Sequence, residues 1–387
     1  TFTNCKNFGK IVSNAAQGSK GGTNMGGIVG HNNTHPVTIT GCSNGSANDG
    51  SLGEIILTGA TTGEARMGGA IGYIQETSSN VTGFNNYGKI TLAGGKATGA
   101  SIGGIVGKIT TFNSENTISA CKNFAEVTIK NAIGDTSGGL GGILGLQLTT
   151  SSKNETQKDE ETGEDITVSV SVTSARITVT GCENNGKVER NTANSSNFHV
   201  GGIAGAFAQT DGVTVSALTN CTNNGAVVNT SDSYATNKYS YTGGIIGYAR
   251  AGGEVSGCTN NGSVTSGNFT NGTTAVRVGG IAGGADNGKL TNCTNNGEVK
   301  DISCSAGGAV GGIVGWVKSR SMTMTNCDNT KPVSCRFDAT EGGKVTISTI
   351  YLGGIIGAAD QVVTMSDCDN TGSVTNNCKA SAAVNIA

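Results

Sequence analysis

The segment Gly26-Gly27-Ile28-Val29-Gly30, followed by Ile39-Thr40-Gly41-Cys42-Ser43-Asn44, contains the two motifs that decide the fold of this 387-residue chain. The glycine motif recurs nine times, and its copies begin at Gly26, Gly68, Gly103, Gly141, Gly201, Gly243, Gly279, Gly311 and Gly353. The second motif reads apolar residue, Ser or Thr, any residue, Cys, any residue, Asn. It occurs ten times at intervals of 34 to 42 residues, with one interval of 61. Insertions therefore fall between the motifs, which is typical of a solenoid.

The apolar residues occur in short alternating runs such as Val37-Thr38-Ile39-Thr40. Alternation with β-branched residues and bounding glycines indicates strands, and no window shows the 3.6-residue periodicity of a helical solenoid. We predict three short strands per repeat: the glycine motif, the segment that enters the Cys and the segment that follows it. The prediction is an all-β, single-domain parallel β-helix over residues 1–387, with nine to ten coils of about 37 residues. An antiparallel propeller is the alternative, but it needs about four strands per repeat.

The Asn two residues after the Cys position is present in all ten copies of the second motif. Equivalent residues of adjacent coils lie about 4.8 Å apart, and an amide side chain both donates and accepts hydrogen bonds. A structural ladder is therefore predicted. Besides Asn7, it comprises Asn44, Asn86, Asn123, Asn184, Asn223, Asn260, Asn295, Asn329 and Asn370.

Nine of the twelve cysteines occupy the Cys position, and Phe84 takes its place in the tenth copy. Because Phe neither forms a disulfide nor binds a metal, we expect small buried thiols there. Bridges between coils and metal binding are weaker alternatives, and no metal or cofactor is expected. Three cysteines outside the column fall in three successive coils, so a Cys304–Cys335 or Cys335–Cys378 bridge is a hypothesis.

Charged residues make up 13 % of the chain and do not recur in a column, so no catalytic residues are predicted. Asp211, Asp286 and Asp360 follow glycine motifs, and we expect solvated turn carboxylates without basic or aromatic partners. His31 and His199 are expected at the surface.

The net charge of −2, from 25 basic and 27 acidic residues, gives no electrostatic case for a nucleic acid partner. No run of about 18 apolar residues is present, so direct membrane insertion is not expected.

The longest insertion, residues 147–176, accounts for the interval of 61 residues. Its segment Ile166-Thr167-Val168-Ser169-Val170 alternates like a strand, which predicts a projecting β-hairpin or flap. The acidic segment 159–165 within it is expected to form a solvated tip, with weak cation binding as the alternative.

Two further patterns keep other functions open. Tyr234, Tyr239, Tyr241 and Tyr248 crowd one coil and could stack on sugars, which favours a carbohydrate-binding or polysaccharide-cleaving β-helix as an alternative. The Ser/Thr column is expected on the face of the cysteines, opposite the apolar column. Its Thr-x-Thr pairs are too few and too scattered for a continuous array, so an ice-binding protein is the weaker alternative.

Gly27-Ile28-Val29-Gly30, together with segments such as Cys258-Thr259-Asn260-Asn261-Gly262-Ser263-Val264, resembles the GLUG motif over essentially the whole chain. GLUG repeats occur in large secreted or surface-anchored bacterial proteins, including adhesin-like proteins and non-catalytic regions of IgA-cleaving proteases. The resemblance implies a cell-surface location and a spacer or adhesive role, and it supplies no catalytic residues. Gly68-Gly69-Ala70-Ile71 is similar to repeats of the chlamydial polymorphic membrane proteins, whereas Phe84-Asn85-Asn86-Tyr87 departs from their second motif.

Together these patterns predict a non-enzymatic extracellular solenoid on a bacterial cell surface, serving as an adhesin stalk or a filament subunit. Its expected partners are other copies or flanking repeats of the same protein, and a host or matrix protein or glycan. The chain starts inside a repeat and ends just after one. We therefore expect an excerpt of a longer protein, or ends that neighbouring subunits cover.

Overall fold

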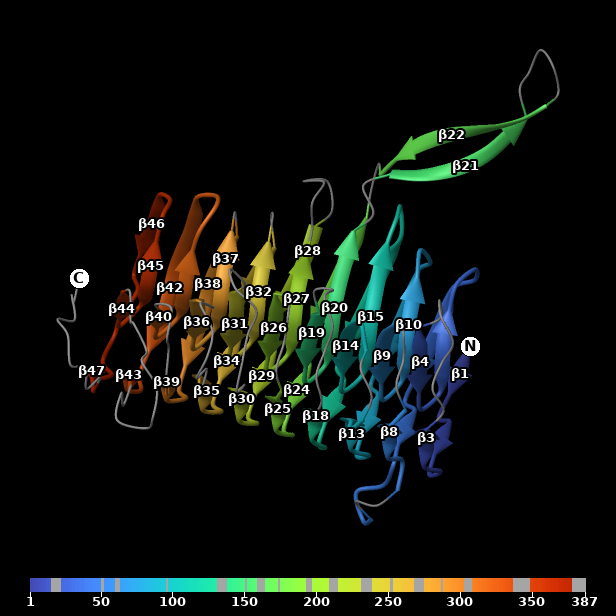
Figure 1. Cartoon of the computed structure of the whole chain (residues 1–387), viewed down its shortest axis with the longest axis horizontal. Helices are drawn as coiled ribbons and strands as arrows, with labels where there is room; N and C mark the ends of the chain where they lie inside the picture. Colours follow the sequence, from blue (N-terminus) through green and yellow to red (C-terminus); the bar gives the residue numbers. More distant parts are fainter. Residues whose placement is uncertain are drawn as a thin grey trace.

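The computed structural model describes residues 1–14, 22–49, 52–59, 63–94, 97–130, 138–149, 152–158, 164–172, 175–192, 197–208, 215–230, 239–250, 253–267, 275–286, 288–302, 308–336 and 349–377. Within these ranges the chain forms a parallel β-solenoid whose coils follow one another along the long axis (Figure 1). The predicted fold class is confirmed. The described residues contain no helix that is long and apolar enough to cross a membrane.

Each coil passes through four sheets, which we number in the order in which the chain meets them. The first sheet receives two short strands from most coils. It consists of β1 (Phe2–Thr3), β2 (Lys6–Asn7), β6 (Val37–Thr40), β7 (Ser43–Asn44), β11 (Ser79–Thr82), β12 (Asn85–Asn86), β16 (Glu115–Ser119), β17 (Lys122–Asn123), β23 (Arg176–Thr180), β24 (Glu183–Asn184), β28 (Val215–Thr219), β29 (Thr222–Asn223), β33 (Glu254–Ser256), β34 (Thr259–Asn260), β38 (Lys289–Asn295), β42 (Met322–Asn329) and β46 (Val363–Ser366).

The other three sheets receive one strand from each coil. The second sheet consists of β3 (Ile11–Ser13), β8 (Ile55–Leu57), β13 (Ile90–Leu92), β18 (Val127–Ile129), β25 (Val188–Asn191), β30 (Val227–Thr230), β35 (Val264–Gly267), β39 (Val299–Asp301), β43 (Val333–Cys335) and β47 (Val374–Asn376). The third consists of β4 (Thr23–Gly26), β9 (Glu64–Gly68), β14 (Gly99–Gly103), β19 (Gly138–Gly141), β26 (Phe198–Gly201), β31 (Tyr239–Gly243), β36 (Ala275–Gly279), β40 (Gly308–Gly311) and β44 (Ile350–Gly353). The fourth consists of β5 (Val29–Asn32), β10 (Ile71–Gln75), β15 (Val106–Thr111), β20 (Leu144–Thr149), β27 (Ala204–Ala208), β32 (Ile246–Arg250), β37 (Ala282–Asp286), β41 (Val314–Val317) and β45 (Ile356–Ala359).

The glycine motif does not form a single strand but joins the third sheet to the fourth through a bend. In the coil of β9 and β10, a Cβ added to Gly69 would lie 2.3 Å from the carbonyl oxygen of Gly104. The same added Cβ would lie 2.8 Å from Oδ1 of Asn86. No side chain fits here, because the bend packs directly against the next coil and against the Asn column.

The interior of the solenoid contains two main apolar layers. The first sheet packs against the fourth through residues such as Ile39 and Ile74, and the second packs against the third through residues such as Leu57 and Ile102. Each of these side chains is at most 1 % exposed, and burying one stabilises the fold by about 1.5–3 kcal/mol. One apolar layer thus lies behind the fourth sheet and the other behind the third. These two sheets meet at an angle, and the faces that they turn toward each other point away from the core.

The Asn column forms an unbroken chain of side-chain hydrogen bonds from Asn7 to Asn370. In every step Nδ2 donates to Oδ1 of the Asn in the following coil, at 2.7 to 2.8 Å. In most coils Nδ2 also donates to the carbonyl oxygen two residues later, as Asn223 does to Gly225 at 2.8 Å. These bonds satisfy amides that would otherwise be buried without partners.

The residue before the Cys position has a left-handed backbone conformation in all ten coils. The φ angles of 51° to 63° belong to Asn4, Gly41, Gly83, Ala120, Gly181, Asn220, Gly257, Asn292, Asn326 and Asp367. This conformation breaks the alternation of the strand, so that Thr40 is exposed while Cys42 is buried. The expectation that the Ser/Thr column shares the face of the cysteines is therefore wrong.

Seven of the nine cysteines in the column are buried free thiols, whereas Cys5 is exposed and Cys368 half-buried. Cys304 and Cys378 lie outside the described residues, so the two hypothetical bridges lie there as well. Cys335 is buried, with Sγ 3.2 Å from Oδ1 of Asn376.

A two-stranded antiparallel hairpin lies within residues 147–176 and extends away from the solenoid (Figure 1). It consists of β21 (Ser152–Lys158) and β22 (Asp165–Ser171). At its base, Val172 and Ala175 pack against Phe112. The predicted acidic tip lies mostly outside the described residues.

Candidate functional site

Alternate side chains of the third and fourth sheets point away from the core and meet where the two sheets join. We call this surface the inner angle. Its third-sheet column, two residues before each glycine motif, is Asn24, Arg66, Ser101, Gly139, His199, Tyr241, Arg277, Ala309 and Tyr351. Its fourth-sheet column, one residue after each motif, is His31, Tyr73, Lys108, Leu146, Ala206, Tyr248, Gly284, Trp316 and Ala358.

Three of the four predicted tyrosines come together in the inner angle. The ring centroids of Tyr241 and Tyr248 lie 4.5 Å apart, and those of Tyr239 and Tyr241 lie 6.1 Å apart. His199 joins them, with its ring 5.3 Å from that of Tyr248. A Cβ at Gly284 would lie 2.6 Å from the Tyr241 ring, so the rings pack closely over this glycine. Tyr234 lies outside the described residues.

Two cations and the chain's single tryptophan continue this cluster into the next coils. The guanidinium of Arg277 lies 3.4 Å from the ring centroid of Trp316, and the ammonium of Lys318 lies 3.9 Å from that of Tyr239. Both are cation–π contacts. The ring of Tyr351 meets Trp316 edge to face at 5.6 Å. We call the ring-bearing residues together with Arg250, Arg277, Lys318 and Asp286 the aromatic–cation cluster.

The carboxylates in this region are not the unpartnered turn residues that we expected. Asp286 is only 2 % exposed and accepts the hydroxyl of Tyr248 at 2.6 Å. Its other oxygen accepts the backbone N–H groups of Lys318 and Ser319, each at 2.9 Å. Asp360 is exposed but accepts the indole N–H of Trp316 at 3.0 Å. Both aspartates therefore have aromatic partners; Asp211 lies outside the described residues.

His199 is also not a surface residue, because its side chain is 7 % exposed. Burial, together with the nearby charge of Arg250, lowers the pKa of His199 to about 3. Its Nδ1 is buried without a hydrogen-bond partner among the described residues. Burial likewise raises the pKa values of Tyr241 and Tyr248. The cluster thus contains a neutral imidazole and neutral phenols at physiological pH.

A second group of polar residues lies in the inner angle of earlier coils. The carboxylate of Glu64 pairs with Lys108 at 2.5 Å and with Arg66 at 3.1 Å, and it also accepts the hydroxyl of Ser101. The guanidinium of Arg66 lies 4.4 Å from the ring centroid of Tyr73. Burial lowers the pKa of Lys108, although Glu64 opposes this effect. Both cations of this group are ion-paired with the one carboxylate, which fits a structural role better than ligand binding.

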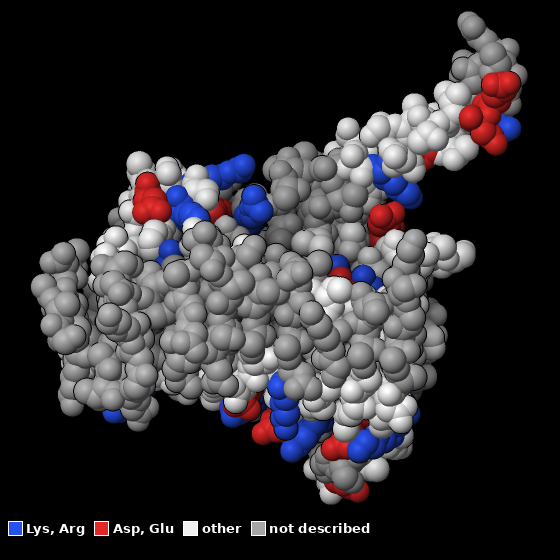
Figure 2. Space-filling view, viewed as in Figure 1, with Lys and Arg blue, Asp and Glu red and all other residues white. Residues whose placement is uncertain are grey.

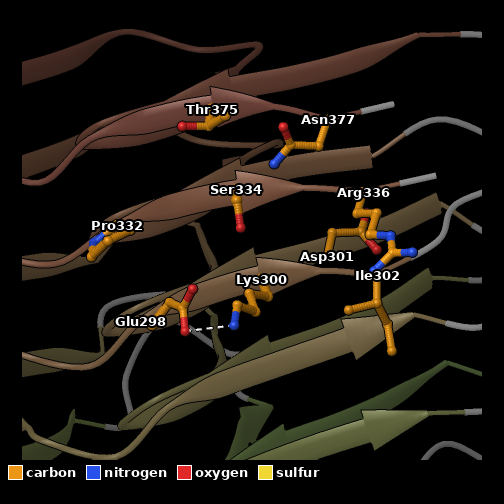
Figure 3. A pocket seen from close by; sticks show the side chains of 9 residues that line it. All are labelled: Glu298, Lys300, Asp301, Ile302, Pro332, Ser334, Arg336, Thr375 and Asn377. Atoms are coloured by element: carbon orange, nitrogen blue, oxygen red, sulfur yellow. Dashed lines mark ion pairs between the residues drawn. The ribbon is translucent and has the colours of Figure 1, made fainter. Parts of the chain in front are cut away.

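A shallow depression of about 370 Å³ lies on the second sheet, over β39, β43 and β47 (Figure 3). Lys300 and Glu298 at its floor pair with each other at 2.6 Å. The described residues contain no group of three or more His, Cys, Asp or Glu side chains that could hold a metal ion.

Recurrence in the sequence could not reveal His199, Arg277, Trp316 or Asp286, because each residue type occurs only once or twice at its repeat position. Aligning the repeats at the positions two before and one after the glycine motif would have placed the first three in the two facing columns. Asp286 shares its position, three residues after the glycine motif, with Asp360 alone.

Comparison with known proteins gives a repeat class rather than an activity. The model of the GLUG motif matches residues 274–300, so the resemblance to GLUG-motif repeat proteins is confirmed there. Among solved structures, the chain is similar to a protein from Bacteroides ovatus described as a "putative immunoglobulin A1 protease". The similarity has a TM-score of 0.33 and 19 % identity, and covers 73 % of this chain and 78 % of the other. Curated protein sequences gave no match.

Proposed function

We propose that the protein is a non-enzymatic structural and adhesive solenoid of a bacterial cell surface. One observation carries this proposal: the features that recur in every coil serve the stacking of coils. The Asn ladder, the buried cysteines, the glycine bend and the left-handed residue all lie at coil-to-coil contacts. Repetition of this kind is what a rigid spacer needs, since length is gained by adding coils.

The polysaccharide-cleaving alternative has less support. Glycoside hydrolysis uses two carboxyl groups on either side of the scissile bond, one of them able to give up a proton. In the aromatic–cation cluster, both oxygens of Asp286 already accept hydrogen bonds, and one of these donors is the Tyr248 hydroxyl. Glu64 is held by two cations and a hydroxyl. Neither carboxylate is therefore positioned to donate a proton to a glycosidic oxygen.

The test combines cleavage and adhesion. The purified chain is incubated with a panel of polysaccharides and proteins, immunoglobulin A1 among them, and the products are analysed by mass spectrometry. Beads coated with the chain are then tested for attachment to glycan-coated and matrix-coated surfaces. The proposal predicts attachment without new fragments. Catalytic turnover of any substrate would overturn it, as would beads that attach no better than uncoated ones.

A further inference from the structure

The aromatic–cation cluster differs from the group around Glu64 in how its cations are partnered. Lys318 and Arg250 form no ion pair with any described residue. The nearby carboxylates, Asp286 and Asp360, accept hydrogen bonds from rings and backbone instead. In the group around Glu64, by contrast, the cations are paired with that carboxylate. A surplus of positive charge therefore remains beside the rings.

The cluster also presents ring surfaces to solvent. Tyr239, Tyr248, Trp316 and Tyr351 are each half-buried, as is Lys318, and Arg250 is exposed. Tyr241 and His199 are buried beneath them, at 4 % and 7 % exposure. The rings of Tyr241 and Tyr248 pack over Gly284, and the buried rings support the outer ones. Basic side chains gather, with acidic ones beside them, at the upper edge of the C-terminal coils in Figure 2.

The spacing of the rings suits an extended ligand. Tyr241 and Tyr248 belong to one coil, Trp316 lies two coils further along, and Tyr351 lies one coil beyond that. Coils repeat at about 4.8 Å, so the rings form a row along the axis of the solenoid. Half-buried aromatic faces stack on the apolar faces of ligands, and a row of them suits a chain of rings.

We propose that the aromatic–cation cluster binds an acidic saccharide chain, one built from uronic acid units. Tyr239, Tyr248 and Trp316 lie against the sugar faces, while Lys318 and Arg250 meet the carboxylates by charge-assisted hydrogen bonds. The neutral His199 adds no competing charge. This inference rests on the proposed adhesive function, for which it names a ligand class and a site.

The single tryptophan makes the test specific, since Trp316 lies in the cluster itself. Its fluorescence is followed while the full chain is titrated with tetragalacturonate. Maltotetraose serves as the neutral saccharide and tetraglutamate as the acidic non-saccharide. The expected result is a saturable fluorescence change with tetragalacturonate. The affinity for either of the other two ligands should be at least about tenfold lower. Equal affinity for maltotetraose would overturn the acidic class, and equal affinity for tetraglutamate would overturn the saccharide.

Variants identify the residues. Lys318→Ala and Tyr239→Ala should each weaken the affinity about tenfold or more, since each removes one contact. The matched control is Tyr87→Ala, which breaks another stacked pair, Tyr87 with Phe124 at 4.9 Å, beside lysines that are already ion-paired. Circular dichroism confirms that each variant is folded. If Tyr239→Ala does not fold, Lys318→Ala alone decides, because Lys318 is only half-buried. Unchanged affinity in Lys318→Ala, or an equal loss in Tyr87→Ala, would overturn the assignment.

Mass spectrometry of the same samples separates the two proposals. If the tetramer stays intact and no saturable fluorescence change occurs, the saccharide inference fails while the structural function stands. If the tetramer binds and is shortened, the ligand class stands and the non-enzymatic function fails.

Discussion

The Asn ladder makes a prediction that compares two neighbouring residues of the same type. Asn223 is fully buried and bonded to Asn184, Asn260 and the carbonyl of Gly225, at 2.7 to 2.8 Å. Asn224 belongs to a second, exposed row, in which it donates to Asn185 and accepts from Asn261, both at 2.8 Å. The two side chains therefore have similar bonds and differ in burial.

Replacing Asn223 by Ala removes one hydrogen bond from each of three buried polar groups: one N–H of Asn184, whose other N–H still donates to Gly186, Oδ1 of Asn260 and the Gly225 carbonyl. Each such group costs about 1–3 kcal/mol, so the free energy of unfolding should fall by about 3 kcal/mol or more. Asn224→Ala frees groups that water can reach, and its cost should be about 0.5 kcal/mol or less.

Urea unfolding followed by far-UV circular dichroism measures the two losses. Amide hydrogen exchange at Asn261, whose N–H bonds the carbonyl of Asn223 at 2.7 Å, reports whether the damage starts in this coil. Equal losses in the two variants, or a loss below about 1 kcal/mol for Asn223→Ala, would refute the view that the buried ladder stabilises the stack.

Three further predictions concern the backbone, pH and the hairpin. Ala120→Gly should raise stability by about 0.5–1 kcal/mol, because Ala120 has a φ of 51°. Gly181→Ala, whose added Cβ meets nothing within 4 Å, should lower it by about 1 kcal/mol; urea midpoints that move the other way contradict both. The pKa of His199 falls from 6.5 to about 3 on folding. Below pH 6.5 the unfolded chain therefore binds a proton at His199 that the folded chain does not bind. The free energy of unfolding should therefore fall by about 1.4 kcal/mol for each pH unit as the pH is lowered from about 6.5 toward 3. His199→Gln should flatten this pH profile, and His35→Gln, at an exposed position, should not. Replacing residues 152–171 by a short Gly-Ser linker should lower the melting temperature only slightly, since β21 and β22 pair with each other and their side-chain contacts with the coils are confined to the base, where Lys153 pairs with Glu76 and Val170 packs near Phe112; a large drop would show that the hairpin supports the coils.

Recurrence made the interior of this protein predictable. A position filled ten times by Asn, or nine times by Cys and once by Phe84, reports the same physical demand in every coil, and the stacking of coils follows from it. The residue before the Cys shows the limit. Gly, Asn, Asp and Ala120 share a left-handed backbone conformation there but no side-chain chemistry. The residue types at this position therefore do not reveal the shared conformation.

The surface was less predictable, because its contacts join residues that occur once. Asp286 recurs only as Asp360, three residues after a glycine motif in each case, and its partners come from the middle of β32 and from the turn after β41. The tyrosines could be predicted as a group because four of them lie within residues 234–248. The contact of Arg277 with Trp316 required knowing that the glycine motif folds two strands toward each other.

The Asn ladder also gives the solenoid a sense of direction. Every step has its donor in the N-terminal coil of the pair and its acceptor in the C-terminal coil. The side-chain amide dipoles therefore all point in the same direction along the axis. A further coil continues this alignment only in the same orientation, whether it comes from the same polypeptide or from another molecule. If copies of this chain associate through their ends, as proposed, the ladder favours head-to-tail over tail-to-tail contacts.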